Sequence, residues 1–335
     1  MKVKKNPVKV RSNGAPTGRF HKRNTGIPLD LDIIKGIHVN RSAVERRAAT
    51  LGKRRSVKKE WQAAWLLRAL SCIDLTTLAG DDTPGNVTRL CAKARQPVRK
   101  DILAELGMEK EGLTVGAICV YHTMIKTAKV ALAGTSIPIA VVSTGFPAGQ
   151  ITLQQKIREI QSSVKAGAGE IDIVISREHV LRGNWRALYN EVAKFREACG
   201  DTHMKTILAT GELATFTNVA KASFVCMMAG ADFIKTSTGK ESVNATLPVS
   251  LVMVRAIREY FELTGYKVGF KPAGGIRKAK QSVEWLILIK EELGDDWLTS
   301  DLFRFGASGL LGDIERQLEH FITGRYSASF RHPMA

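Results

Sequence analysis

Two lysines that follow apolar segments are the residues of this sequence best suited to covalent chemistry. Lys235 ends the apolar run of "ADFIKTSTGK" (231–240), and Lys271 ends that of "KVGFKPA" (267–273). A lysine among core residues is costly to desolvate, and two ammonium groups at close range repel, so at least one pKa falls. The neutral amine can then attack a carbonyl carbon and form a Schiff base. A single lysine in such a place would be interpreted as a side chain that reaches solvent from a strand end, whereas the pair indicates imine chemistry.

Three further residues lie within apolar segments where a polar or reactive side chain needs an explanation. Asp172 interrupts "EIDIVIS" (170–176), and we interpret it as a proton shuttle that works with Lys271. Asp74 in "CIDLT" is either a loop cap or a group that orients a neighbour. Cys119 in "GAICVY" is interpreted as a small core residue rather than a nucleophile, and it is also placed to line a pocket.

Glycine-bearing segments follow the last three apolar runs and indicate a phosphate site. They are "STGK" (237–240), "AGGIRK" (273–278) and "GASGLLGD" (306–313). Glycine lets the backbone N–H groups approach an anion closely, while basic and hydroxyl side chains add charge and donors. The alternative is that these glycines only form tight turns. The candidate phosphate residues are Gly239, Lys240, Gly274, Gly275, Arg277, Ser308 and Gly309.

The elements that must position these residues are predicted to be eight strands alternating with helices. Apolar segments at 72–76, 116–121, 138–144, 170–176, 203–210, 231–237, 267–273 and 302–308 are separated by segments of helical period. This alternation predicts a (β/α)8 barrel, with the active site at the carboxyl ends of the strands. Lys235 and Lys271 then lie on neighbouring strands and face each other. A doubly wound open sheet is the alternative, and no G-x-G-x-x-G segment supports it.

The two ends of the chain are predicted to lie outside the barrel. Residues 1–29 contain eight basic residues, no acidic residue and several prolines and glycines, which predicts a disordered basic tail. A helical segment over 30–70 is expected to pack on a barrel over 71–326, and 327–335 form a C-terminal tail. Residues 1–60 carry 17 Lys and Arg against 4 Asp and Glu. Their charge is interpreted as a solubilising tail, with a weak polyanion or RNA contact as a second hypothesis.

Composition narrows the class of protein further. No apolar run approaches the roughly 18 residues that suggest a membrane span. The five cysteines form no C-x-x-C pair, which favours a reduced compartment, and we expect a cytoplasmic protein with nuclear presence left open. The histidines and cysteines show no zinc spacing, so no metal is expected. The sequence leaves a homo-oligomer open.

Seven ordered segments resemble the deoxyribose-phosphate aldolase family. They are "IDLTTL", "AICVY", "EIDIVI", "KTILATGEL", "ADFIKTSTGK", "VGFKPAGGIR" and "RFGAS", and the resemblance covers roughly residues 58–326. The segments "VKKEWQAAWLL" and "GDIERQLEHFITGRY" are similar to the animal-type branch. The resemblance implies that Lys235 forms the Schiff base, Lys271 tunes it and Asp172 transfers protons. We expect Asp74, Cys119 and Thr210 to line the substrate pocket. The resemblance implies that the substrate phosphate is held by Lys240, Gly274, Gly275, Arg277 and Ser308.

The implied reaction is the reversible cleavage of 2-deoxy-D-ribose 5-phosphate to D-glyceraldehyde 3-phosphate and acetaldehyde, in deoxyribonucleoside catabolism. It requires no metal or organic cofactor, because the imine itself accepts the electrons. Two residues depart from the family pattern: Gly309 stands where a second hydroxyl residue is usual, and His122 replaces a common proline. A different phosphosugar aldolase on the same barrel is the alternative, because the fold alone does not set the substrate.

Overall fold

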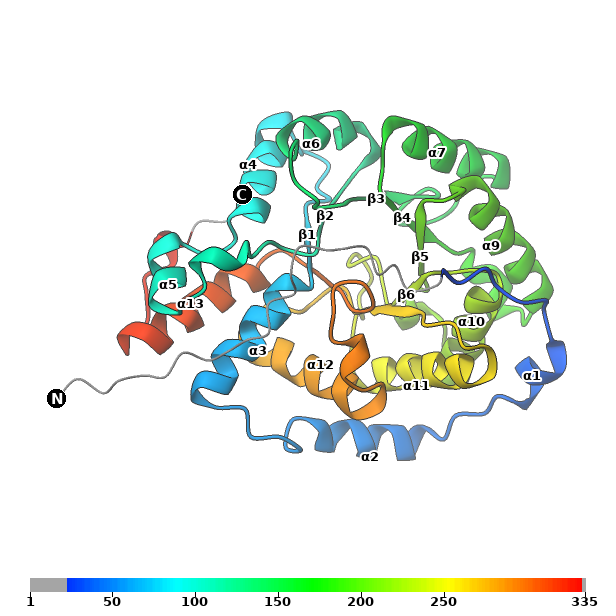
Figure 1. The fold of residues 1–335 in the computed structure, drawn as a ribbon. Coiled ribbons are helices and arrows are strands. Elements are labelled where there is room, and N and C mark those ends of the chain that lie inside the picture. The colour runs from blue at the N-terminus through cyan, green and yellow to red at the C-terminus, as the bar shows by residue number, and fades with distance from the viewer. Residues whose placement is uncertain (1–22, 333–335) are drawn as a thin grey trace.

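A barrel of eight short parallel strands surrounded by helices forms the body of the protein (Figure 1). The computed structural model describes residues 23–332. The strands are β1 (Ile73–Thr76), β2 (Ala117–Val120), β3 (Ile139–Ser143), β4 (Glu170–Val174), β5 (His203–Ile207), β6 (Phe233–Lys235), β7 (Gly269–Lys271) and β8 (Phe305–Ala307). Each lies within one of the eight predicted apolar segments. The prediction of eight strands is therefore confirmed.

The barrel is closed between its seventh and eighth strands. Each strand from β1 to β7 pairs in parallel with the next, and β8 pairs with β1. Two isolated parallel bridges, Phe270 with Phe303 and Ala273 with Gly306, join β7 to the chain around β8. An open doubly wound sheet would leave two unpaired edges, so the structure is the predicted (β/α)8 barrel.

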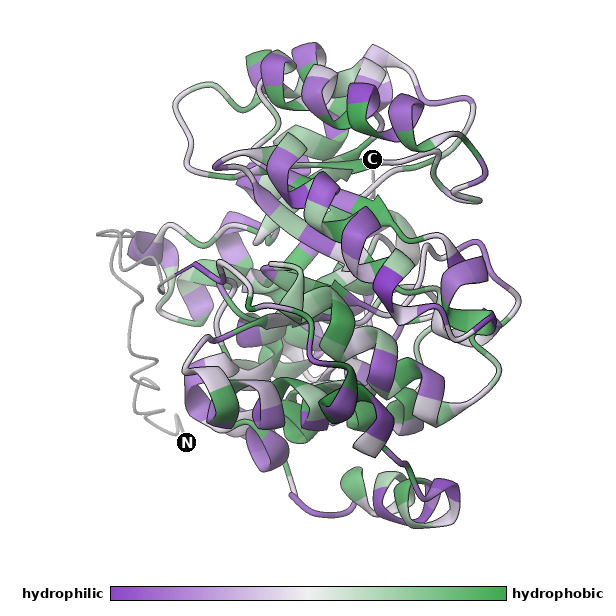
Figure 2. Ribbon diagram, turned by 90° about the vertical axis from the view of Figure 1, so that its right-hand side faces the viewer, coloured by the Kyte–Doolittle hydropathy of each residue, from purple (hydrophilic) through white to green (hydrophobic). Residues whose placement is uncertain are grey.

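Helices connect successive strands and cover the outside of the barrel. They are α4 (Pro84–Arg95), α5 (Lys100–Glu105), α6 (Ile125–Ala131), α7 (Leu153–Ala166), α8 (Arg177–Leu181), α9 (Trp185–Cys199), α10 (Phe216–Met228), α11 (Leu247–Thr264), α12 (Ala279–Glu292) and α13 (Leu310–Thr323). Many of them are hydrophobic on one side and hydrophilic on the other (Figure 2). Helix α7 begins with a capping box formed by Thr152 and Gln155.

Three helices precede the barrel: α1 (Leu31–Gly36), α2 (Arg41–Leu51) and α3 (Lys59–Ser71). Helix α2 packs along α11 and α12, and α3 packs between α12 and α13 (Figure 1). Their apolar residues, such as Leu51, Leu66 and Leu70, are buried in the same core as the barrel helices. The segment over 30–70 therefore lies against the outside of the barrel.

The prediction of a disordered tail over residues 1–29 is wrong for residues 23–29. Residues 1–22 lie outside the described part of the chain. Asn24 is buried, and its Nδ2 donates to the carbonyl oxygens of Met227 (2.8 Å) and Ala231 (2.9 Å). The amide of Ile27 donates to the carbonyl of Met228 at 2.8 Å. The last carbonyls of a helix have no partner inside it, and these residues supply donors to the end of α10. The prediction of disorder relied on the low hydrophobicity of this segment, but the segment is held in place by hydrogen bonds, which hydrophobicity does not report.

Several basic residues of the N-terminal segment are paired with acidic residues of the barrel. Arg47 lies 3.0 Å from a carboxylate oxygen of Glu292, and Arg55 lies 2.7 Å from one of Glu291. Part of the positive charge that suggested a polyanion contact is thus neutralised within the molecule. Among residues 23–332, no helix is both long and apolar enough to cross a membrane.

The C-terminal tail packs on α13. His332 is buried, and its Nε2 lies 2.6 Å from a carboxylate oxygen of Glu319. Ser327 is also buried. The described part of the predicted tail, residues 327–332, therefore contacts the outer helix.

Candidate active site

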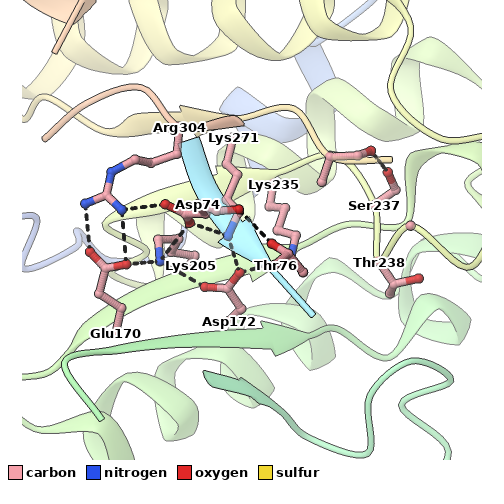
Figure 3. A network of polar contacts seen from close by, with 12 residues as sticks. Asp74, Thr76, Glu170, Asp172, Lys205, Lys235, Ser237, Thr238, Lys271 and Arg304 are labelled. Atoms are coloured by element: carbon pink, nitrogen blue, oxygen red, sulfur yellow. Dashed lines mark hydrogen bonds and ion pairs between the residues drawn. The ribbon is translucent and has the colours of Figure 1, made fainter. Parts of the chain in front are cut away.

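Seven ionisable side chains meet inside the barrel and form one buried network, here called the central cluster (Figure 3). They come from β1, β4, β5, β6, β7 and the residue before β8, and each is at most 5% exposed. The members are Asp74, Glu170, Asp172, Lys205, Lys235, Lys271 and Arg304. Buried charges are retained where each finds partners, so this network defines the candidate site.

Three lysines converge on Asp172, as Figure 3 shows. The Nζ atoms of Lys235 and Lys271 lie 2.9 Å and 2.8 Å from its Oδ2. The Nζ of Lys205 lies 3.0 Å from its Oδ1. Lys235 and Lys271 are directly opposite each other in the β6–β7 register, as predicted from the sequence. The structure therefore brings together the predicted catalytic residues, with the carboxylate between the two lysines.

A second group of contacts extends the cluster toward the amino ends of the strands. Arg304 donates to Asp74 Oδ1 (2.6 Å) and to Glu170 Oε1 (3.0 Å). Asp74 also contacts Lys271, and Glu170 contacts Lys205. Asp74 is thus a buried group that orients Lys271. It is not a loop cap, which was the other interpretation of this residue.

The central cluster contains four cationic side chains and three carboxylates. Lys271 contacts Asp74 and Asp172, while Arg304 contacts Asp74 and Glu170. Lys235 contacts only one carboxylate of the cluster, that of Asp172. One cation has no matching anion, so loss of a proton from Lys235 would leave the cluster electrically balanced.

The pKa values follow this arrangement. Burial lowers the pKa of Lys235, and the positive charge of Lys271 acts in the same direction against the attraction of Asp172. Burial alone would also lower the pKa of Lys271, but the carboxylates of Asp172 and Asp74 outweigh it and raise that pKa. Burial would raise the pKa values of the Asp172 and Asp74 carboxylates, but the adjacent cations outweigh burial and hold both pKa values below the ordinary range. Lys235 is therefore the amine of the cluster that is most readily neutral.

The remaining predicted pocket residues are Cys119 on β2 and Thr210 after β5. Cys119 on β2 is buried beside Ala140 and Val142, and burial raises the pKa of its thiol, which fits a core residue. Thr210 follows β5, and its backbone N–H donates to the carbonyl of Thr236, which directly follows Lys235. The Oγ1 of Thr210 is buried and has no hydrogen-bond partner within residues 23–332. It is therefore a hydroxyl that a bound molecule could contact.

The glycine-bearing loops after β6 and β7 lie next to each other. Ser237 Oγ donates to the carbonyl of Ala273 at 2.5 Å, and the chain after β7 bridges to Gly306. Gly239, Gly274 and Gly275 have φ values of 88°, 82° and 82°, which side chains rarely adopt. A Cβ placed on Gly239 would lie 3.9 Å from Gly274 Cα. The structure thus brings together the loops after β6 and β7, two of the three that are predicted to hold phosphate through their glycines. The third of these loops follows β8.

Most of the predicted phosphate residues lie at the surface. Lys240, Gly275, Arg277, Ser308 and Gly309 are exposed. Gly309 is the N-cap residue of α13, where backbone N–H groups of a helix point outward. The amide of Gly239 differs from the prediction, because it already donates to Glu241 Oε2 at 3.1 Å.

Sequence reasoning missed Lys205, Glu170 and Arg304. Lys205 and Glu170 lie within apolar strand segments, the same signal that identified Asp172. Arg304 is likewise a charged residue within the apolar segment "LFRFGAS". No group of three His, Cys, Asp or Glu side chains in the described part of the chain is arranged to hold a metal ion.

A closed (β/α)8 barrel with buried ionisable side chains gathered among its strands is an arrangement typical of barrel enzymes. Comparison with known sequences makes the class specific. Residues 68–290 match the sequence model of the DeoC/LacD family aldolases, and the chain belongs to this family. It is an aldolase, an enzyme that makes and breaks carbon–carbon bonds.

Named relatives and solved structures agree with the family. The chain is 62% identical to deoxyribose-phosphate aldolase of Mus musculus over 92% of this chain and 98% of the relative. It is 60% identical to the Homo sapiens protein of that name, over 93% and 99%. A putative deoxyribose-phosphate aldolase structure from Toxoplasma gondii has a TM-score of 0.67 at 21% identity, covering 79% of this chain and 98% of that one. The tetrameric deoxyribose phosphate aldolase of Aeropyrum pernix has a TM-score of 0.53 at 22% identity, over 84% and 99%. The two structures share the fold of this chain.

Proposed function

We propose that this protein is a class I aldolase that cleaves 2-deoxy-D-ribose 5-phosphate to D-glyceraldehyde 3-phosphate and acetaldehyde through a Schiff base on Lys235. The observation that carries the proposal is the place of Lys235 in the central cluster. It is buried, its pKa is lowered, and it contacts a single carboxylate, while the other cations contact two or more. The names of the mammalian relatives support the substrate.

The first half of the reaction forms the imine. The neutral amine of Lys235 attacks the aldehyde carbon C1 of the open-chain sugar, and the carbinolamine loses water to give a protonated imine. Asp172 lies 2.9 Å from the Lys235 nitrogen and 2.8 Å from that of Lys271. It is therefore placed to pass protons between the reacting nitrogen, Lys271 and water.

The second half of the reaction breaks the C2–C3 bond. The C3 hydroxyl loses its proton and becomes the aldehyde of glyceraldehyde 3-phosphate, while the bonding electrons move into the imine to give an enamine. Protonation of the enamine at C2 and addition of water then release acetaldehyde and return the Lys235 amine. Asp172 and Lys271 supply and accept these protons. The imine accepts the electrons, so the reaction needs no metal.

Substrate binding is assigned to the surrounding loops. The loops with Gly239, Gly274, Gly275 and Gly309 hold the substrate phosphate, with added charge from Lys240 and Arg277 and a hydroxyl from Ser308. The positive φ values and close approach of Gly239 and Gly274 support a backbone site for an anion. The Thr210 hydroxyl, which is buried and has no hydrogen-bond partner within residues 23–332, is assigned to the sugar.

Borohydride reduction in the presence of acetaldehyde tests the proposal. Reduction converts the imine to a stable ethyl-lysine, and peptide mass spectrometry should place the added mass on Lys235. Lys235→Ala should abolish both the adduct and turnover. An unmodified Lys235, or an adduct on Lys271 alone, would show that the assignment is wrong. A panel of donor aldehydes, with and without phosphate on the acceptor, separates this substrate from other phosphosugars.

The wider role follows from this reaction. Cleavage of a deoxyribose phosphate belongs to deoxyribonucleoside catabolism, and a cytoplasmic location stays a prediction from the cysteines. We also propose a homo-oligomer, because a tetramer is named for the Aeropyrum pernix relative. A polyanion or RNA contact of residues 1–60 stays a separate hypothesis, and salt-dependent RNA binding that is lost on deletion of residues 1–30 would support it.

A further inference from the structure

Glu241 occupies backbone donors that the substrate phosphate is expected to use. One of its carboxylate oxygens accepts from Thr238 Oγ1 (2.8 Å) and from the amide of Gly239 (3.1 Å). Both oxygens lie 3.0 Å from the amide nitrogen of Thr238. These donors belong to the loop directly after β6, three and four residues beyond Lys235. A carboxylate of the chain itself is thus bound where an anionic ligand would bind.

The loop that carries Glu241 also contacts the loops on either side of it. Asn244 Nδ2 donates to the Glu241 carbonyl at 2.8 Å, and the Asn244 side chain lies close against Gly274. On the other side, the carbonyl of Val243 approaches Gly211 so closely that a Cβ there would lie 2.2 Å from it. The position of Glu241 is therefore coupled to the loops after β5 and β7, which carry Thr210 and the other phosphate-binding glycines.

A phosphate group and the Glu241 carboxylate compete for the same donors. Both are anions with several acceptor oxygens, and two anions in one small nest of N–H groups repel each other. A phosphate monoester carries about −1.5 to −2 charges near pH 7, against one for the carboxylate, so it forms stronger charge-assisted hydrogen bonds. Binding of phosphate then requires the carboxylate to leave.

We propose that Glu241 is an internal anion that occupies the phosphate site until the substrate phosphate displaces it, and that it thereby determines the specificity of the site for phosphate. This inference rests on the proposed function for the substrate, but the competition concerns any phosphate anion. Removing the charge of Glu241 frees its donors and strengthens phosphate binding. A substrate without phosphate gains nothing from that change.

Direct binding of inorganic phosphate tests the inference. Isothermal titration calorimetry is performed on the full chain as wild type, Glu241→Gln and Glu241→Ala, with thermal unfolding to verify the fold of each. We expect the Kd for phosphate to fall about tenfold in both variants, since a charged acceptor is replaced by a neutral one or by none. The KM for 2-deoxyribose 5-phosphate should fall in parallel, and this fall should exceed any change in the KM for unphosphorylated 2-deoxyribose. Glu262→Gln, an exposed residue near the other end of α11, is the matched control and should leave the Kd unaltered.

Each outcome decides the inference separately from the proposed function. An unchanged or weaker phosphate affinity in the Glu241 variants overturns it, because Glu241 would then support the site or lie outside it. Failure of the wild type to bind phosphate also overturns it. A wild type that binds phosphate but neither traps acetaldehyde nor cleaves the sugar refutes the proposed function, while the calorimetric comparison still decides the role of Glu241.

Discussion

Replacing Lys271 by leucine is the change that most directly tests the charge balance of the central cluster. Lys235 and Lys271 lie 2.9 Å and 2.8 Å from the same oxygen of Asp172. Removal of the Lys271 charge leaves three cations against three carboxylates, so Lys235 becomes necessary as a counter-charge. The pKa of Lys235 should therefore rise, and imine formation should slow at neutral pH.

The size of this effect follows from the geometry. Two nitrogens this close to one atom are at most about 5.7 Å apart, and at an effective dielectric constant of about 20 their repulsion is about 3 kcal/mol. That energy corresponds to about two pKa units, so the neutral fraction of Lys235 near pH 7 should fall about 100-fold. The loss of proton transfer through Lys271 adds to the effect on turnover, and kcat should nearly vanish.

The pH dependence of acetaldehyde trapping by borohydride separates the two effects. Trapping measures imine formation, and its rate falls as pH drops through the pKa of Lys235. In Lys271→Leu the acid limb should shift upward by about two pH units, with partial recovery of the rate at high pH. Lys267→Leu, a lysine of the segment that leads into β7 and is paired with Asp296, is the control and should not move the limb. An acid limb that stays in place or moves downward would refute the charge-balance argument.

Three further predictions concern the stability of the fold. Arg304→Met should lower the free energy of unfolding by about 3 to 5 kcal/mol, because Asp74 and Glu170 each lose one buried cationic partner. Arg182→Met at an exposed pair should change it by less than about 1 kcal/mol; urea unfolding compares the two, and equal effects would contradict the prediction. The fold lowers the pKa values of the cluster carboxylates, so they stabilise the folded state above the unfolded pKa of about 4, and this stabilisation is lost as the pH falls below it. Circular dichroism during acid titration should show the loss. An unfolding free energy that does not change between about pH 5 and 2 would argue against it. Asn24→Ala should cost about 2 kcal/mol and speed proteolytic cleavage near residue 23, because the segment loses two buried hydrogen bonds to the carbonyls of Met227 and Ala231. Cleavage at the wild-type rate would indicate that Asn24 does not anchor the segment.

The amino-acid sequence by itself determined the barrel and the facing lysines. Buried parallel strands are apolar on both faces, so each of the eight strands appears as a short apolar run, and the separating helices appear through their period. Consecutive strands of a barrel are neighbours, and strand ends gather at one face. Lys235 and Lys271, each at the end of such a run, therefore had to meet.

Only the tertiary structure decided which other charges join them and which donors are already occupied. Whether a strand residue points inward depends on the register and tilt of the whole barrel. Lys205, Glu170 and Arg304 were visible as charged residues in apolar segments, but the local pattern did not show that their side chains point into the barrel. Asn24 is held by the end of α10, some 200 residues away, and no local pattern encodes that contact. Glu241 was visible in the sequence as a residue after a glycine and a lysine, but the fold of its loop places its carboxylate on the amides of Thr238 and Gly239. The positions of the strands follow from local periodicity, whereas charge balance and competition for donors depend on distances that only the folded chain establishes.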